Sequence, residues 1–169
     1  MMGVGILASL LVWKVTHQPP PPKVGAPAPA FSLPQLDGNG SVSLRSLRGK
    51  TVVLNFFGSW CPGCKQESPV LERLWRQERR RGLVVLGVDT NELSQGDGTR
   101  FVQAHHLTYP IVYDANGGVA FNRYAAFWLP VTYVLNRRGR IVGGELLGAL
   151  NNDTYEQTIR RYVDAALKS

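Results

Sequence analysis

The sequence has few cysteines and little charge. Only two of its 169 residues, Cys61 and Cys64, are cysteine, which excludes a scaffold of several disulfides and a zinc site of four cysteines. No apolar run reaches the roughly 18 residues that mark a transmembrane helix, so a protein with several membrane spans is also excluded. Hydrophobic residues nevertheless make up 44% of the chain, which excludes a disordered protein and is enough for the core of one domain.

Acidic residues are outnumbered by basic ones. Nineteen Lys and Arg against twelve Asp and Glu give a formal net charge of +7. The arginines are scattered, and aromatic residues do not alternate with them as they would in a platform for stacking bases. We therefore expect no nucleic-acid partner, and we interpret the charge as a solvated surface with some affinity for acidic lipid headgroups.

The first thirteen residues are apolar and uncharged, and Lys14 interrupts them. A helix of that length spans about 20 Å, less than the ~30 Å hydrocarbon core, and no basic residue precedes it as in a secretory signal. Three interpretations are open: a short uncleaved membrane anchor over residues 1–16, a cleaved signal, or a start site placed too late. We favour the anchor.

A proline-rich linker is expected over residues 17–23. Four consecutive prolines, Pro19 to Pro22, favour a polyproline II spacer that holds the following domain about 12 Å from its anchor. No second linker or internal repeat follows, so residues 24–169 are expected to form one domain.

Hydrophobic and turn patterns predict an α/β domain. A β-hairpin opens it across the turn at Asp37–Gly40, and a buried strand of parallel type covers residues 51–57. Further strands are expected over residues 83–88, 109–113, 131–135 and 140–142. Helices are expected from the cysteine pair to Gly82, over residues 99–106 and 118–124, and from Asp153 onward. A polar loop is expected over residues 89–98. This order implies a central mixed β-sheet flanked by helices on both faces.

The two cysteines lie where a buried strand gives way to a helix. At the helix N-terminus, free N–H groups and the helix dipole stabilise a thiolate, so the pKa of Cys61 is expected to fall. Pro62 suits the first helical position, and Cys64 lies one turn further on, close enough to form a disulfide. The pattern predicts an exposed attacking Cys61 and a sheltered resolving Cys64, as thiol–disulfide exchange requires.

Two other interpretations of the pair are weak. A zinc site would need two more ligands, and the side chains of the adjacent candidates His105 and His106 diverge. A purely structural disulfide that closes so short a loop would restrict the unfolded chain very little. We therefore expect a redox-active disulfide, with no metal and no separate cofactor.

Two more features belong to the predicted site. Asn55, in the strand before the cysteines, cannot ionise, so Glu67 on the following helix is the candidate proton acceptor, with a pKa raised by partial burial. Pro130 opens a strand, which predicts a cis Leu129–Pro130 bond beside the cysteines. The Leu129 backbone could then pair with an extended substrate segment, and Trp60 and Pro62, which flank Cys61, are also expected to contact the substrate.

These motifs resemble the thioredoxin superfamily and, within it, the membrane-anchored TlpA/ResA/CcmG (DsbE) group. The similar segments are the opening at residues 24–33, the active-site block at residues 54–67 and the Leu129–Thr132 segment, with residues 90–124 corresponding to a central α/β insertion. The resemblance implies a thioredoxin-like fold with an N-terminal β-hairpin. It implies that Cys61 is the nucleophile and Cys64 the resolving thiol, with Glu67 and the cis-proline Pro130 beside them.

The resemblance also implies a function. Proteins of this group usually face the extracytoplasmic, periplasmic side of a bacterial membrane. Many reduce the haem-binding cysteines of apocytochrome c with electrons from a membrane thiol transporter. We therefore expect a monomeric, membrane-anchored thiol–disulfide oxidoreductase that acts as a reductant in cytochrome c maturation.

Other functions remain open at this stage. A disulfide-forming oxidase or a general disulfide reductase differs from the leading hypothesis only in redox potential or substrate. A peroxiredoxin-type peroxidase is disfavoured, because Gly58 and Asn55 stand where that family needs a Thr or Ser and a Pro before its reactive cysteine. A redox-inert module that binds partners through its basic surface and the Leu129–Pro130 edge is a further alternative.

Overall fold

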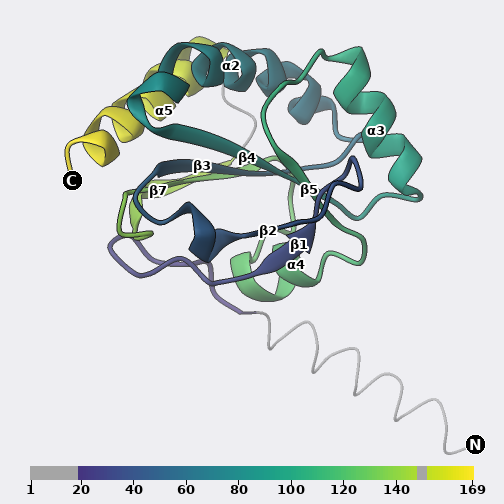
Figure 1. Ribbon diagram of the computed structural model, residues 1–169, viewed down its shortest axis with the longest axis horizontal. Coiled ribbons are helices and arrows are strands. Elements are labelled where there is room, and N and C mark those ends of the chain that lie inside the picture. Colours follow the sequence, from purple (N-terminus) through teal and green to yellow (C-terminus); the bar gives the residue numbers. More distant parts are fainter. Residues whose placement is uncertain (1–18, 148–151) are drawn as a thin grey trace, which may run out of the picture.

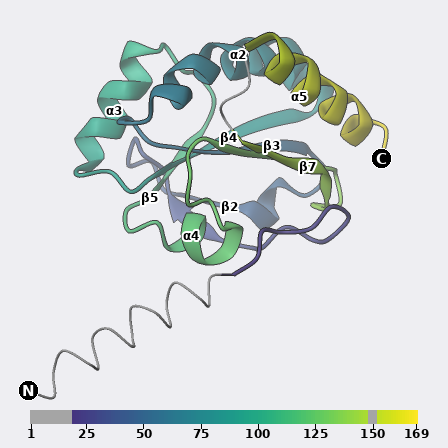
Figure 2. The same ribbon diagram turned by 180° about the vertical axis from the view of Figure 1, so that it is seen from behind.

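The computed structural model describes residues 19–147 and 152–169. The elements are β1 (Ser32–Pro34), β2 (Ser41–Ser43), the 3₁₀ turn η1 (Leu44–Leu47), β3 (Thr51–Phe57), α2 (Pro62–Glu78), the 3₁₀ turn η2 (Arg79–Arg81), β4 (Leu83–Thr90), α3 (Gln95–Ala104), β5 (Ile111–Asp114), α4 (Gly118–Tyr124), β6 (Val131–Leu135), β7 (Ile141–Leu147) and α5 (Asn152–Leu167). They form three layers, with a sheet between α2 and α5 on one face and α4 with the β1–β2 hairpin on the other (Figures 1 and 2).

The central sheet has the strand order β5-β4-β3-β6-β7. Strands β3, β4 and β5 run parallel, whereas β6 lies antiparallel to β3, and β7 lies antiparallel to β6. β3 is the middle strand of the five, and every one of its residues, TVVLNFF, is buried there. The sheet is therefore mixed and covered on both faces, as the sequence predicted.

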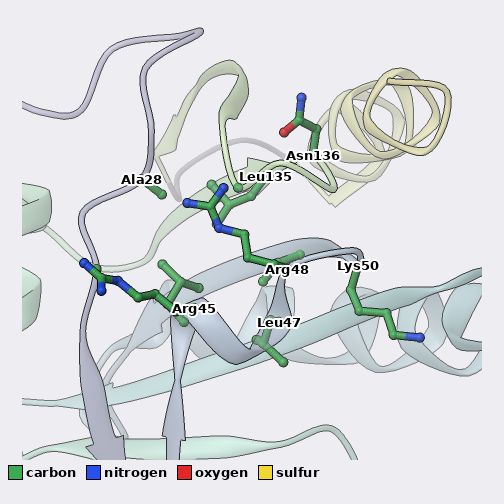
Figure 3. Close-up of a pocket in the computed structure, with 11 residues that line it drawn as sticks. Ala28, Arg45, Leu47, Arg48, Lys50, Leu135 and Asn136 are labelled. Carbon is green, nitrogen blue, oxygen red and sulfur yellow. The ribbon is translucent and has the colours of Figure 1, made fainter.

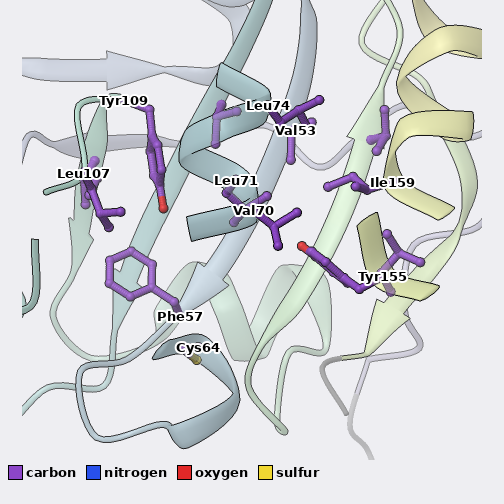
Figure 4. Packing of buried hydrophobic residues seen from close by; sticks show 14 of the residues in the cluster. Val53, Phe57, Cys64, Val70, Leu71, Leu74, Leu107, Tyr109, Tyr155 and Ile159 are labelled. Atoms are coloured by element: carbon purple, nitrogen blue, oxygen red, sulfur yellow. The ribbon is translucent and has the colours of Figure 1, made fainter. Parts of the chain in front are cut away.

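Alternate residues of β3 serve two separate cores. Val53 and Phe57 face the layer of α2 and α5, where Leu71 and Ile159 are completely buried. Val52, Leu54 and Phe56 belong to the core on the face of α4. Cys64 lies at one end of the first core, which also includes Leu71 and Leu74 of α2 (Figure 4). The helix that bears the cysteines is therefore packed against the sheet along its length.

Several predicted elements are confirmed. The hairpin at residues 32–43 is antiparallel, and the strands over residues 51–57 and 131–135 have the predicted bounds. The first helix gives way to η2 and stops at Gly82, whose φ of 91° lies in the left-handed region.

Other boundaries differ from the sequence prediction. Residues 89–98 are not a continuous loop, since Asp89 and Thr90 complete β4 and α3 starts at Gln95. Ser94 and Asp97 form a capping box there, a signal that the helix-disfavouring Gly96 and Gly98 obscured in the sequence. The following strand is shifted to residues 111–114, β7 extends from Ile141 to Leu147 despite two glycines, and α5 starts one residue earlier than predicted, at Asn152.

Within residues 19–147 and 152–169, no helix is both long and apolar enough to cross a membrane. The predicted anchor, residues 1–16, and the first part of the predicted linker lie outside the described residues.

Gly143 gives a test of how tightly α5 packs on β7. Its φ is +79°, and a Cβ built there would lie 2.5 Å from the Tyr162 ring. Gly143→Ala therefore adds a steric clash to a backbone penalty, and we expect it to lower the free energy of unfolding by about 2–4 kcal/mol in urea titrations. The control is Gly38→Ala, with φ +80° and no atom within 4 Å of the new Cβ, which should cost only about 1 kcal/mol. Equal losses in the two variants would contradict the proposed clash.

Candidate functional site

The cysteine pair lies at the junction of β3 and α2. Cys61 is the N-cap of α2 in an extended conformation, and Pro62 is the first helical residue. The backbone N–H of Cys64 donates to Cys61 Sγ at 3.1 Å, and the two sulfurs form a disulfide with a Cα–Cα distance of 5.3 Å. An N–H group of the first helical turn, which has no carbonyl partner within the helix, thus donates to the sulfur of Cys61, where it would also stabilise a thiolate.

The predicted exposure of Cys61 is wrong for this oxidised form. Cys61 is 2% exposed and Cys64 is 1% exposed, so both sulfur-bearing residues are buried. The bond to Cys64 and the hydrogen bond from the Cys64 N–H turn the Cys61 sulfur inward, which the sequence pattern alone could not show. A reductant therefore needs some local movement around Cys61 to reach the disulfide.

Glu67 lies one helical turn after Cys64 and is only 5% exposed. Its Oε1 accepts a hydrogen bond of 2.5 Å from Asn55 Nδ2, which also donates to Thr132 Oγ1 at 2.9 Å. Thr132 Oγ1 in turn lies 3.1 Å from the Tyr155 hydroxyl. One residue each from β3, α2, β6 and α5 thus forms a buried polar chain behind the disulfide. Thr132 and Tyr155 were not singled out in the sequence, because only the fold brings them to Glu67.

The environment of Glu67 suits proton transfer. Burial raises its pKa to about 8, and the hydrogen bond from Asn55 opposes that shift only in part. The carboxyl group of Glu67 therefore keeps its proton at neutral pH. Its pKa is close to the ordinary pKa of a thiol, ~8.5. A group with this pKa can give a proton to a leaving thiolate and take one from a thiol.

The cis Leu129–Pro130 bond predicted from the sequence is confirmed. Val131, the next residue, pairs with Phe56 in the antiparallel register of β3 and β6, so Pro130 lies beside the end of β3 that leads to Cys61. Pro130 is buried, and Leu129 is half-buried. The sheet register thus brings the proline loop to the cysteines across some seventy residues of sequence.

Large apolar side chains are exposed around this end of the sheet. Trp60 precedes Cys61 and is 52% exposed, Trp128 is 85% exposed two residues before Pro130, and Leu147, paired with Val131, is 55% exposed. Pro62 is also exposed. The predicted substrate-contacting residues are therefore accessible except for Pro130. Trp128 and Leu147 were missed, although a tryptophan so close to the proline was a usable signal.

The β4–α3 loop fixes the segment that precedes Cys61. Both carboxylate oxygens of Glu92 accept from Ser59: Oε1 from its backbone N–H, and Oε2 from its hydroxyl at 2.7 Å. The Trp60 indole N–H donates to the Asn91 carbonyl at 3.1 Å. Glu92 was not predicted from the sequence, because its position depends on where α3 begins.

A second buried carboxyl group, that of Asp89, lies at the end of β4. It is 0% exposed, and burial together with the nearby Glu92 raises its pKa to about 8. Neither of its side-chain oxygens has a hydrogen-bond partner among the described residues. Carboxyl groups therefore gather at the carboxyl end of the parallel strands, the same end as the disulfide.

Comparison with known proteins is consistent with this geometry. The AhpC/TSA family matches residues 24–143. The thiol-disulfide oxidoreductase ResA of Halalkalibacterium halodurans is 38% identical over 120 residues, which cover 71% of this chain and 66% of that protein. The thioredoxin-like protein YneN of Bacillus subtilis is 33% identical over 136 residues, covering 80% of this chain and 78% of that protein.

Among solved structures, a Chlorobium tepidum protein described as a thiol:disulfide interchange protein DsbE is similar with a TM-score of 0.77. It is 24% identical, and the match covers 86% of this chain and 99% of that one. This likeness confirms the thioredoxin-like fold.

The role of Glu67 can be tested by following reduction of the disulfide with dithiothreitol. Glu67→Gln cannot protonate the departing Cys64 thiolate, so we expect reduction to slow about 10-fold at pH 7. The rate ratio of wild type to variant should shrink above pH 8, where the carboxyl group has lost its proton. Glu78→Gln, at the far end of the same helix, is the control and should keep a ratio near 1. A pH-independent ratio would remove Glu67 from proton transfer.

The raised pKa of Glu67 also predicts how stability depends on pH. The oxidised folded chain keeps the Glu67 proton up to about pH 8, whereas the unfolded chain releases it near 4.5. The folded state therefore binds more protons between these values, and its stability falls as pH rises through this range. Burial of Asp89 acts in the same direction, so the quantity to measure is the difference between wild type and Glu67→Gln in urea unfolding. We expect this difference to change by about 3–5 kcal/mol from pH 4.5 to 8.5 in favour of the variant; a constant difference would contradict the raised pKa.

Proposed function

This chain belongs to the AhpC/TSA family and is a thiol–disulfide oxidoreductase of the ResA type, and we propose that it reduces disulfides in proteins on the extracytoplasmic side of a membrane. The observation that carries the proposal is the Cys61–Cys64 disulfide at the N-terminus of α2, backed by the buried carboxyl group of Glu67. The pair exchanges two electrons and needs no separate cofactor.

Reduction of a substrate starts from the dithiol form. The Cys61 thiolate, stabilised by the helix N-terminus, attacks one sulfur of the substrate disulfide. A mixed disulfide forms between Cys61 and the substrate, the substrate's S–S bond breaks, and its other sulfur leaves as a thiolate that takes up a proton.

Cys64 completes the transfer. Glu67 in its ionised form accepts the proton of the Cys64 thiol, and the resulting thiolate attacks Cys61 Sγ. The bond between Cys61 and the substrate breaks, and the second substrate sulfur leaves as a thiolate that takes up a proton. The substrate is then a dithiol, and the chain is left with the Cys61–Cys64 disulfide seen in the structure. Two electrons have moved from the protein to the substrate, so a dithiol donor must restore the cysteines.

The substrate is proposed to bind as an extended segment beside Pro130. Leu129 lies two residues before the first residue of β6, and its backbone would pair with an extended substrate segment. Trp60 and Pro62, which flank Cys61, would offer apolar surface to the same segment, and exposed Trp128 would add to it. An unfolded polypeptide with a disulfide and apolar neighbours fits this surface, and apocytochrome c with oxidised haem-binding cysteines is the proposed substrate.

The proposed location follows from the sequence. Residues 1–16 would anchor the domain to the membrane, and the prolines of residues 17–23 would space it from the surface. A protein disulfide persists in an oxidising, extracytoplasmic compartment, where a reductant needs its own supply of electrons. A membrane thiol transporter is the proposed donor, and the domain is proposed to act as a monomer.

Three alternatives predict different measurements. A disulfide-forming oxidase would have a reduction potential well above that of glutathione, measured by equilibration with a glutathione buffer. A peroxidase would consume hydrogen peroxide. Gly58 and Asn55 stand where such a peroxidase needs a Thr or Ser and a Pro. A redox-inert binding module would bind its partner equally well after loss of Cys61.

Trapping tests the proposed reaction and its substrate together. The full chain with Cys64→Ser should retain a mixed disulfide on Cys61, because the resolving thiol is missing. We expect a peptide with an oxidised Cys-X-X-Cys-His haem motif to be trapped, as detected by mass spectrometry, at least 10-fold faster than a peptide whose disulfide has the same spacing but lacks the histidine and its neighbours.

The control is Cys61→Ser, which should trap neither peptide and should not accelerate insulin reduction by dithiothreitol. Equal trapping of both peptides would identify a general disulfide reductase and contradict the cytochrome assignment. Absence of trapping with intact peptide binding would contradict redox catalysis itself.

A further inference from the structure

Charge is distributed unevenly between the two ends of the sheet. The end opposite the disulfide is formed by residues 44–50 before β3, residues 79–81 before β4, and residues 136–140 between β6 and β7. The backbone joins these segments, since Gly49 N donates to the Arg137 carbonyl at 2.9 Å and Thr51 N donates to the Gly82 carbonyl at 3.1 Å. They therefore form one continuous surface, which we call the basic end.

The basic end carries many cations and no acid of its own. Its three segments contain no Asp or Glu, and their exposed basic residues are Arg45, Arg48, Lys50, Arg79, Arg80, Arg81, Arg137, Arg138 and Arg140. Within the described part of the chain, only Arg81 among them forms an ion pair, with Glu78. Figure 3 shows Arg45, Arg48 and Lys50 extending in different directions around a shallow hollow. The surface thus presents a broad, uncompensated positive charge.

Carboxyl groups occupy the other end. Asp89 is the last residue but one of β4, and Asp114 is the last residue of β5. Glu92 lies in the loop after β4, and Asp97 lies in the first turn of α3. Strand β3 separates this end from the basic end by seven residues, or about 20 Å. The domain is therefore positive at one end of its strands and carries the disulfide at the other.

The segment that follows the proline-rich linker, residues 25–28, is hydrogen-bonded to the basic end. Gly25 N donates to the Ile141 carbonyl at 2.9 Å, and Ala28 N donates to the Gly139 carbonyl at 3.0 Å. Arg140 Nη1 donates to the Gly25 carbonyl at 2.7 Å. An N-terminal anchor would therefore bring this end of the domain, and not the cysteine end, toward the bilayer.

We propose that the basic end docks on the anionic phospholipid headgroups of the membrane that holds the anchor, so that the disulfide faces away from the bilayer. The inference rests on the proposed N-terminal attachment to a membrane. Charge complementarity favours an anionic surface. The hydrogen bonds of residues 25–28 to the basic end, and the lack of aromatic residues for base stacking in its three segments, favour a lipid bilayer over a nucleic acid as that surface. Docking would leave Cys61 about 20 Å from the headgroups, open to polypeptide substrates.

Partition of the full chain onto vesicles tests the proposal. The ratio of its partition onto phosphatidylcholine vesicles with and without 30% phosphatidylglycerol isolates the electrostatic contribution, because an apolar anchor enters both equally. Since each surface cation contributes about 5-fold, we expect Lys50→Gln/Arg137→Gln/Arg138→Gln to lower this ratio at least 10-fold in low salt. The control, Lys65→Gln/Arg73→Gln/Arg100→Gln, removes the same charge from α2 and α3, outside the basic end, and should change this ratio less than 2-fold.

Hydrogen–deuterium exchange then locates the contact. Peptides that include residues 44–50 and 136–140 should be protected only on vesicles with phosphatidylglycerol and only in low salt. An equal loss of the ratio in both triple variants would show that net charge alone acts and would overturn the proposal, as would a wild-type ratio of 1. Stronger protection of these peptides by an oligonucleotide than by the vesicles would also overturn it, in favour of nucleic acid.

The outcome is separable from the proposed function. Partition onto phosphatidylcholine alone reports the anchor, and insulin reduction, which should be unchanged in the basic-end variant, reports the cysteines. A lost ratio with intact reduction would leave the oxidoreductase assignment standing.

Discussion

The antiparallel pairing of β3 with β6 is the constraint on which the active end depends. β3 delivers the cysteines at its carboxyl end, and β6 begins with the residue after the cis-proline, so a shift of this register would move Pro130 away from Cys61. The same register pairs Asn55 with Thr132, the two residues that bridge Glu67 to Tyr155. The disulfide, the cis-proline loop and the buried carboxyl group of Glu67 are thus held in place by one pair of strands.

Burial of a carboxyl group beside a disulfide is costly unless the group is protonated or well hydrogen-bonded. Asn55 is informative in this respect, because an amide at that position donates to Glu67 without competing for its proton. An aspartate there would repel Glu67 and change the pKa of both groups. The carboxyl group of Glu67 therefore lies on the helix that bears the cysteines, and the strand contributes a neutral amide that holds it.

Local patterns were sufficient to predict most of the fold. The β-branched and aromatic residues of β3 and the turn at Asp37–Gly40 specify their structures with neighbouring residues alone. The start of α3 was misplaced because Gly96 and Gly98 weaken the helical pattern locally, while the capping box and the close packing of Gly98 on Asp89 favour the helix. Tertiary contacts decide such boundaries, and a single sequence does not display them.

The site divides in the same way. Cys61, Cys64, Glu67 and Pro130 could be predicted because each stands next to a motif that already specifies its surroundings. Glu92 and Tyr155 could not, since they reach the site from a loop and a helix whose positions depend on the whole sheet. The buried state of Cys61 belongs to this second class too, because helix position alone favours an exposed sulfur.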